Sequence, residues 1–250
     1  MKKKLILLPL IAAALLMLTG CINIGGRRVT VIGENIITGT GPMVTRNIDV
    51  ADFSAVDITG NFLVVYQVAS ETALTVVMQE NLFQRLETNV RGGTLEISTW
   101  AITITGNNRP RLYIYSPYLT AASFSGAVNA EEWDTVYGHS FTVNASGAVD
   151  IDIAVEVYSL EIEASGAVNL TLGMYVEVLD LNLSGAADAR LSGFAREIDI
   201  NGAGAVNLRA GSLITEGGRV DVSGASNVYL STLENIDVNT SGLARVRQSN

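Results

Sequence analysis

A short motif that recurs seven times at nearly constant spacing constrains the fold more than any other feature of this 250-residue chain. Its commonest form is Ser-Gly-Ala-Val-Asn, and successive glycines are separated by 21, 19, 19, 19, 20 and 18 residues. These corner glycines are Gly126, Gly147, Gly166, Gly185, Gly204, Gly224 and Gly242. A fixed period of this length is typical of proteins in which similar units stack on one another.

Apolar and polar residues alternate on both sides of each glycine. The fourth residue before it is Val143, Ile162 or Leu181 in successive copies, and the second residue after it is most often valine. This period of two is typical of β-strands with one buried face. The glycine permits a tight bend, and the preceding serine can bond the local backbone.

One unit is too short to bury its own apolar face, whereas stacked copies bury a continuous core. We therefore expect an all-β fold, a right-handed parallel β-helix (β-solenoid) with about seven regular rungs of ~19 residues. An antiparallel sandwich also has short strands, but it would not repeat one corner residue in every second strand.

The residues before the repeats are also rich in β-strand patterns. Residues 47–120 are expected to form irregular N-terminal β coils that cap the regular β-helix of residues 121–250; a separate N-terminal domain is the alternative. Residues 81–87 fit either a helical turn or a wide loop. The predicted strands are 55–58, 62–67, 74–78, 95–98 and 111–115.

The N-terminus has the pattern of a targeting segment. Three lysines at residues 2–4 precede an apolar stretch at residues 5–18, which is short for a membrane span and suits a signal peptide. The stretch ends in Leu-Thr-Gly-Cys21, which is similar to the lipobox of bacterial lipoproteins. That resemblance implies removal of residues 1–20, lipidation of Cys21, and a flexible tether over residues 21–46. An ordinary signal peptide or an uncleaved anchor is the alternative.

Composition excludes several classes of protein. Only 16% of the residues are charged and 48% are apolar, so the chain is not intrinsically disordered. One cysteine rules out a disulfide scaffold. After residue 20 the chain has 13 arginines, no lysine and 25 acidic residues, a net charge of about −12 that does not suit a nucleic-acid binder. We expect an exported protein, anchored by lipid to the outer membrane or to the outer face of the plasma membrane.

The third residue after each glycine forms a polar column. We expect a structural ladder rather than a catalytic pair, because Asp150 and Asp188 alternate with asparagine and would lie roughly 9–10 Å apart, with Asn169 between them. A Ser–His triad is also disfavoured, because His139 is the only histidine. The ladder residues are Asn129, Asp150, Asn169, Asp188, Asn207 and Asn227.

A second polar column, five residues before the glycines, is more acidic. Glu161, Asp180 and Asp199 would stack on consecutive rungs. Calcium is the cation that would suit these oxygen ligands, while an acidic face screened by salt is the alternative. No other cofactor is expected.

Most of the aromatic residues that we considered for binding precede the repeats, and no aromatic platform is evident within them. This set fits either a binding patch or, preferably, packing beneath the N-terminal cap. Its members are Trp100, Tyr113, Tyr115, Tyr118, Trp133 and Tyr137.

Together these segments resemble a known bacterial family. Asp-Phe-Ser-Ala-Val at residues 52–56, Gln-Glu-Asn-Leu at 79–82, Gly-Thr-Leu-Glu-Ile at 93–97 and Pro-Tyr-Leu at 117–119 precede the serial Ser-Gly-Ala repeats. The chain resembles the auto-transporter adhesin head (GIN) domain family over about residues 47–246. The resemblance implies an exported, often lipid-anchored β-helical protein, and it supplies no catalytic residues.

The function expected from these features is non-enzymatic. We expect a lipid-anchored envelope or surface protein with a binding, adhesion-like role, whose partner is a surface protein or glycan. One alternative is an envelope structural or stress-linked factor without an external ligand. The other is a β-helix enzyme that acts on polysaccharides.

Overall fold

The computed structural model describes residues 22–24, 27–29, 36–231 and 235–248. The chain divides into two compact units, residues 1–36 and 37–250. In the first unit, β1 (Ile22–Ile24) pairs antiparallel with β2 (Arg27–Val29). The expected signal peptide and Cys21 lie outside the described residues. Within those residues, no helix has the length and apolarity needed to cross a membrane.

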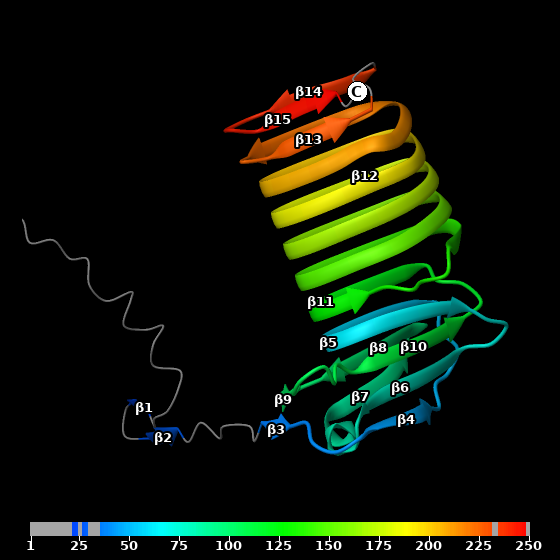
Figure 1. Ribbon diagram of the computed structural model, residues 1–250, viewed down its shortest axis with the longest axis vertical. Helices are drawn as coiled ribbons and strands as arrows, with labels where there is room; N and C mark the ends of the chain where they lie inside the picture. The colour runs from blue at the N-terminus through cyan, green and yellow to red at the C-terminus, as the bar shows by residue number, and fades with distance from the viewer. Residues whose placement is uncertain (1–21, 25–26, 30–35, 232–234, 249–250) are drawn as a thin grey trace, which may run out of the picture. The chain divides into compact units, whose positions relative to one another are not determined.

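The second unit is almost entirely β-structure, with a single short helix among its described residues (Figure 1). Its elements are β3 (Ile37–Thr38), β4 (Met43–Ile48), β5 (Ala55–Val68), β6 (Ala73–Gln79), the 3-10 helix η1 (Glu80–Arg85), β7 (Leu86–Arg91), β8 (Thr94–Thr99), β9 (Ile102–Thr103), β10 (Arg111–Ser116), β11 (Ala121–Ala130), β12 (Val136–Gly224), β13 (Asn227–Leu230), β14 (Ile236–Thr240) and β15 (Arg245–Gln248).

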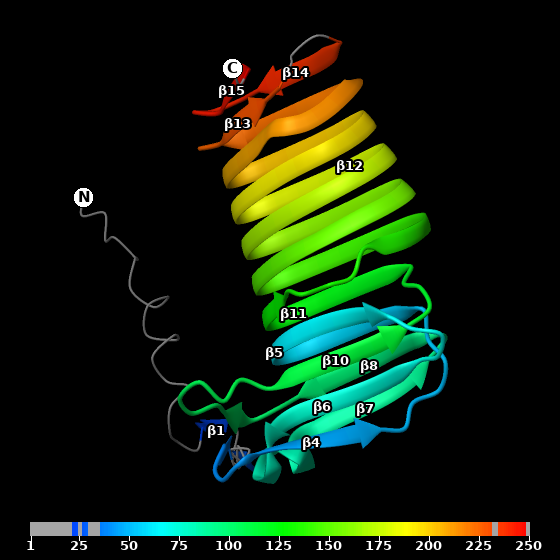
Figure 2. The ribbon, with the colours of Figure 1, turned by 45° about the vertical axis from the view of Figure 1, so that its right-hand side comes forward.

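Parallel pairing between successive coils organises this unit. β11 pairs in parallel with β5 on one side and with the start of β12 on the other, and β12 then winds through further coils to Gly224 (Figures 1 and 2). The register joins Gly60 to Gly126 and Gly126 to Gly147. Alternate residues of each coil point inward and are buried, so the coils share one continuous apolar core.

The corner glycines are required by the backbone conformation and by close contact between coils. All seven have positive φ, for example 101° at Gly147. A Cβ at Gly147 would lie 2.4 Å from the carbonyl oxygen of Gly126, so no larger residue fits without displacing the neighbouring coil. Gly60, with φ of 143°, belongs to the same column, although it lies far from the repeats in the sequence.

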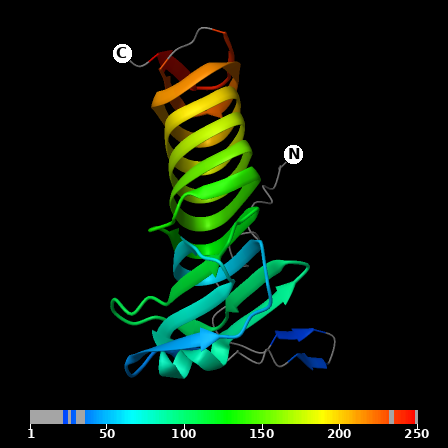
Figure 3. The ribbon, with the colours of Figure 1, turned by 90° about the vertical axis from the view of Figure 1, so that its right-hand side faces the viewer.

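Antiparallel strands close the N-terminal end of the stack. β8 and β10 pair in parallel with the two halves of β5, and β7 and β6 then pair antiparallel with β8 and β10 (labelled in Figure 2; Figure 3 shows the same end from another side). β4 adds antiparallel to β6. This reversal of direction ends the parallel coils within the same compact unit, not in a separate domain.

The predicted N-terminal strands are confirmed, with one correction to where the folded unit begins. The five predicted strands lie within β5, β6, β8 and β10, and the ambiguous segment 81–87 is helical as far as Arg85, in η1. The expected boundary at residue 47 is wrong: β3 and β4 begin earlier and join the folded unit. β3 and β4 are short, and their residues are half-exposed or exposed, so their sequences do not alternate between apolar and polar residues as the later strands do.

Aromatic packing joins the cap to the first regular coil. Trp133 lies 5.3 Å from Tyr66 and 6.0 Å from Phe124, measured between ring centroids, and its Nε1 donates to the carbonyl oxygen of Val64. The Tyr66 hydroxyl donates to the Ser116 carbonyl oxygen. Burial, helped by the nearby carboxylate of Asp134, raises the pKa of Tyr66 to about 12, so the phenol stays neutral in this packed position.

Candidate functional site

A groove of about 1080 Å³ runs across the coils of the second unit. It is lined by the three residues that precede each corner glycine, and we call it the serine–asparagine groove. Its lining includes Asp57 near the cap and Ser241 near the C-terminal end, so it spans the coils from β5 to β14. The constant register of the corners makes the groove continuous, since each coil presents the same positions in the same place.

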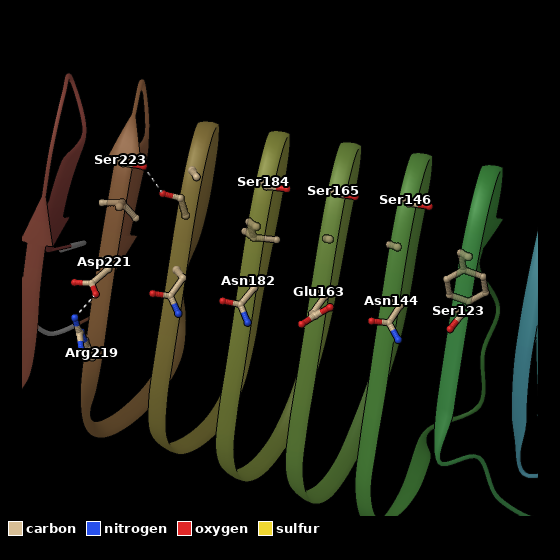
Figure 4. A pocket seen from close by; sticks show the side chains of 18 of the residues that line it. Ser123, Asn144, Ser146, Glu163, Ser165, Asn182, Ser184, Arg219, Asp221 and Ser223 are labelled. Carbon is tan, nitrogen blue, oxygen red and sulfur yellow. Dashed lines mark hydrogen bonds and ion pairs between the residues drawn. The ribbon is translucent and has the colours of Figure 1, made fainter.

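The groove walls carry neutral polar groups (Figure 4). Asparagines occupy most positions three residues before the glycines, and serines occupy most positions directly before them. Between them, small or apolar residues such as Ala145 and Ala164 form the floor. Because hydroxyls and amides both donate and accept hydrogen bonds, the groove offers a repeated set of partners for an extended polar molecule.

The corner serines differ from the expectation that they would bond the local backbone. Ser223 does donate to a backbone oxygen, but that oxygen belongs to Gly202 on the preceding coil. Ser146, Ser165 and Ser184 are exposed along the groove. Their hydroxyl groups are therefore accessible to a ligand in the groove.

An ion pair lies at the C-terminal end of the groove. Arg219 pairs with Asp221 at 2.5 Å, and Asn239 donates to the same carboxylate at 2.7 Å. The hydrogen bonds from Asn239 and Arg219 lower the pKa of Asp221, while the carboxylate raises the pKa of Arg219. The other charged lining residues are Asp57, near the cap, and Glu163, an exposed carboxylate in the middle of the groove.

The acidic column proposed for a cation forms hydrogen bonds with the groove asparagines. Asn182 donates to Asp180 at 2.8 Å, and Asn201 donates to Asp199 at 3.1 Å. Glu161 is exposed on the coil before them. In the part of the chain that the structure describes, no three carboxylate, imidazole or thiol side chains gather closely enough to hold a metal ion. The calcium prediction gains no support from this geometry.

The column after the glycines contains hydrogen bonds between coils. Asn169 donates to Asp150 at 2.5 Å, and Asn207 donates to Asp188 at 3.0 Å. The register also aligns Asn129 with Asp150 and Asn207 with Asn227. Asp188 is further paired with Arg190 and Arg209. An amide placed between carboxylates relieves the repulsion that adjacent aspartates would have, which suits a structural ladder.

A second surface was missed by the sequence reasoning. Two neighbouring outward columns, ten and eight residues before the corner glycines, carry exposed aromatic residues on the regular coils. We call this surface the aromatic strip; it consists of Tyr137, His139, Tyr158, Tyr175, Phe194 and Ile214. The signal was weak because the aromatic residues alternate between the two columns and share them with Glu156, Glu177 and Arg196.

The predicted aromatic patch before the repeats is divided by the structure. Trp133 packs beneath the first coil, which agrees with the packing role preferred from the sequence. Tyr118 and Tyr137, in contrast, are more than half exposed. The guanidinium of Arg85 lies 3.6 Å above the Trp100 ring. The lone histidine, His139, stacks on Tyr158 with centroids 5.2 Å apart, so its place is in the aromatic strip.

Solved structures with a similar fold come from Parabacteroides and Bacteroides species. A protein described as a putative adhesin from Parabacteroides merdae superposes with a TM-score of 0.73 at 17% identity, covering 86% of this chain and 99% of that chain. A protein described as a putative lipid binding protein from Parabacteroides distasonis gives the same TM-score and coverage at 18% identity. A putative adhesin from Bacteroides fragilis gives 0.62 at 16% identity, covering 85% of this chain and all of that chain.

At these identities the likeness shows the fold alone. No curated protein matches this chain. A family model does match, over residues 52–173 and again over residues 157–250, which together span the cap and the repeats. The chain therefore belongs to the family described as "Putative auto-transporter adhesin, head GIN domain".

Proposed function

We propose that this protein is a lipid-anchored, non-enzymatic component of the bacterial envelope that binds an extended surface ligand along the serine–asparagine groove. In this proposal its body is a right-handed β-solenoid of about seven regular rungs. The observation that carries the proposal is the continuity of the groove, about 1080 Å³ lined from Asp57 to Ser241 by the same three positions of each coil. The adhesin description of the family agrees with such a role.

The chemistry of the groove favours binding over catalysis. General acid–base catalysis requires a titratable group positioned at the reacting atom. The groove presents mainly hydroxyls and amides, and its Asp221 is engaged by Arg219 and Asn239. Its two other carboxylates, Asp57 and Glu163, lie on separate coils and do not form a pair. A long row of equivalent neutral partners suits a polymer that is held at many points.

The printed name of one structural relative mentions lipid binding, which suggests a different ligand class. An acyl chain requires a predominantly apolar cavity, because each buried hydroxyl or amide without a partner costs free energy. Serine and asparagine dominate the walls of this groove. We therefore favour an extended polar ligand.

Filling the groove tests the proposal. The full-length chain in detergent would be applied to an array of bacterial and host-surface polysaccharides and matrix proteins. Ser165→Trp and Ser184→Trp place bulky rings in the middle of the groove, where both serines are exposed. Ser70→Trp, at an exposed turn away from the groove lining, is the matched control.

We expect the wild type and the Ser70→Trp variant to bind the same array members, and the two groove variants to lose at least one of them. Equal binding by all four proteins would contradict a role for the groove. Loss of an array polymer through cleavage, detected as shortened products, would instead support the enzymatic alternative.

A further inference from the structure

The aromatic strip lies on the regular coils but on columns different from those of the groove. Its residues stand eight or ten positions before the corner glycines, whereas the groove uses the last three. Along each coil these residues alternate with buried ones such as Val176 and Ala195, so their side chains face outward. The strip is therefore a second, separate surface.

The strip exposes large rings that are already ordered. Tyr158 is 49% exposed and Tyr175 is 62% exposed. Tyr158 stacks on His139 from the preceding coil, nearly parallel at 14°, and Tyr175 lies 5.3 Å from Phe194 of the next coil. Because both pairs are fixed to neighbouring coils, the rings would lose little conformational freedom when a ligand lands on them.

Two of the four charged residues among the rings are paired with each other. Arg196 forms an ion pair and hydrogen bond with Glu177 of the preceding coil, and this contact raises the pKa of the arginine. Glu156 and Glu216 occupy the remaining positions of the two columns. The strip thus combines aromatic faces with carboxylate acceptors for hydroxyl groups.

The size of the strip decides between a macromolecular partner and a small one. A tyrosine or phenylalanine has roughly 150–250 Å² to bury, so four such half-exposed rings offer only about 400 Å². A stable protein partner or a second copy of the chain requires roughly 800 Å² from each side. The aromatic area of the strip is therefore too small for a stable complex with a folded protein, but it is large enough to contact a few sugar rings.

We propose that the aromatic strip binds the pyranose rings of a neutral oligosaccharide whose hydroxyl groups are equatorial. Such a sugar exposes C–H groups on its ring faces, and these polarised hydrogens are attracted to the negative face of an aromatic ring. Its equatorial hydroxyls then reach outward to the carboxylates of Glu156 and Glu177. Tyr158 and Tyr175, the most exposed rings in the middle of the strip, make the principal stacking contacts.

Calorimetric titration of the full-length chain in detergent tests this inference. The probes are linear β-1,4-linked oligomers of glucose and of N-acetylglucosamine, both of which have equatorial hydroxyls. We expect Tyr175→Ala and Tyr158→Ala each to weaken binding roughly tenfold or more, the range seen when a stacking aromatic residue is removed. Tyr175→Phe keeps the ring and should bind almost as the wild type does.

Tyr118→Ala is the matched control, since Tyr118 is 55% exposed but lies outside both surfaces. Unchanged affinity in Tyr175→Ala and Tyr158→Ala, or no binding of either oligomer by the wild type, would overturn the inference. Ser165→Trp should leave oligosaccharide binding intact. Failure of the groove proposal and failure of this inference are thus distinguishable.

Discussion

Single glycines determine how closely the coils can stack. Gly166 has φ of 100°, and a Cβ there would lie 2.5 Å from the carbonyl oxygen of Gly147. Gly166→Ala adds both left-handed backbone strain and this contact, so we expect a loss of roughly 2–4 kcal/mol in the free energy of unfolding. Urea denaturation followed by circular dichroism would measure it.

Gly173 provides the control for that substitution within the same repeat. A Cβ at Gly173 would meet its nearest atoms at 3.9 and 4.0 Å, which is ordinary contact. Gly173→Ala should leave the unfolding midpoint unchanged or raise the stability by about 0.4–1 kcal/mol, because alanine has less freedom to lose on folding. Equal midpoints for the two variants would show that the corner does not constrain the stack.

At the residue scale, sequence reasoning is most informative where one column repeats similar residues. The sequence predicts a ladder that contains Asn169 and Asp150, and in the structure Asn169 donates a hydrogen bond to Asp150. Sequence reasoning failed where a surface is shared between two columns: Tyr158 and Tyr175 stand at different positions of their repeats, so neither column is aromatic throughout. The three groove positions were visible in the sequence, but their concavity depends on the bend at each glycine.

At the element scale, the strands of the cap were predictable, but the way in which they pair was not. The coil containing Gly60 belongs to the stack, yet 65 residues separate it from Gly126 because β6 to β10 are inserted between them. This insertion interrupts the regular spacing of the corner glycines, so Gly60 could not be recognised from spacing alone. The antiparallel direction of β4, β6 and β7 also leaves no mark in the apolar pattern, since parallel and antiparallel strands can both alternate.

The last strand protects the open end of the stack. Among the described strands, β15 lies at the end of the strand order and pairs with β13 alone, so one of its edges faces away from the sheet. It carries exposed Arg245 and Arg247, and charge on an edge strand discourages pairing with a second molecule. Replacing both arginines by valine should shift the protein toward dimers in sedimentation velocity experiments.

The corresponding control lies in an interior coil. Arg209 is exposed and pairs with Asp188, but its backbone is already bonded to β13 within the sheet. Arg209→Val removes a surface ion pair, worth about 0–1 kcal/mol, without freeing an edge. Arg209→Val should sediment as the wild type does, and the edge interpretation would fail if it associated as strongly as the Arg245→Val and Arg247→Val double variant.

At the scale of the whole molecule, repetition lets one chain present two different surfaces. The groove repeats neutral hydroxyls and amides in the three positions before each glycine, while the strip places aromatic rings on the preceding part of the coil. Both surfaces share one core, so the number of coils sets the length of each. In both proposals the number of coils therefore sets how long a polymer, or how many stacked sugars, the protein can bind.

Such surfaces serve an envelope protein only if the chain is held at a membrane, which is the role proposed for Cys21. Cys21→Ser removes the only thiol of the chain, so we expect it to abolish incorporation of radiolabelled palmitate in growing cells. Two or more acyl chains give stable anchoring, whereas one is marginal, so the wild type should also partition into detergent. Thr19→Ser, a small change beside the proposed cleavage site, should retain the label. Labelling of Cys21→Ser at the wild-type level would refute lipidation at this residue and leave the uncleaved apolar segment as the anchor.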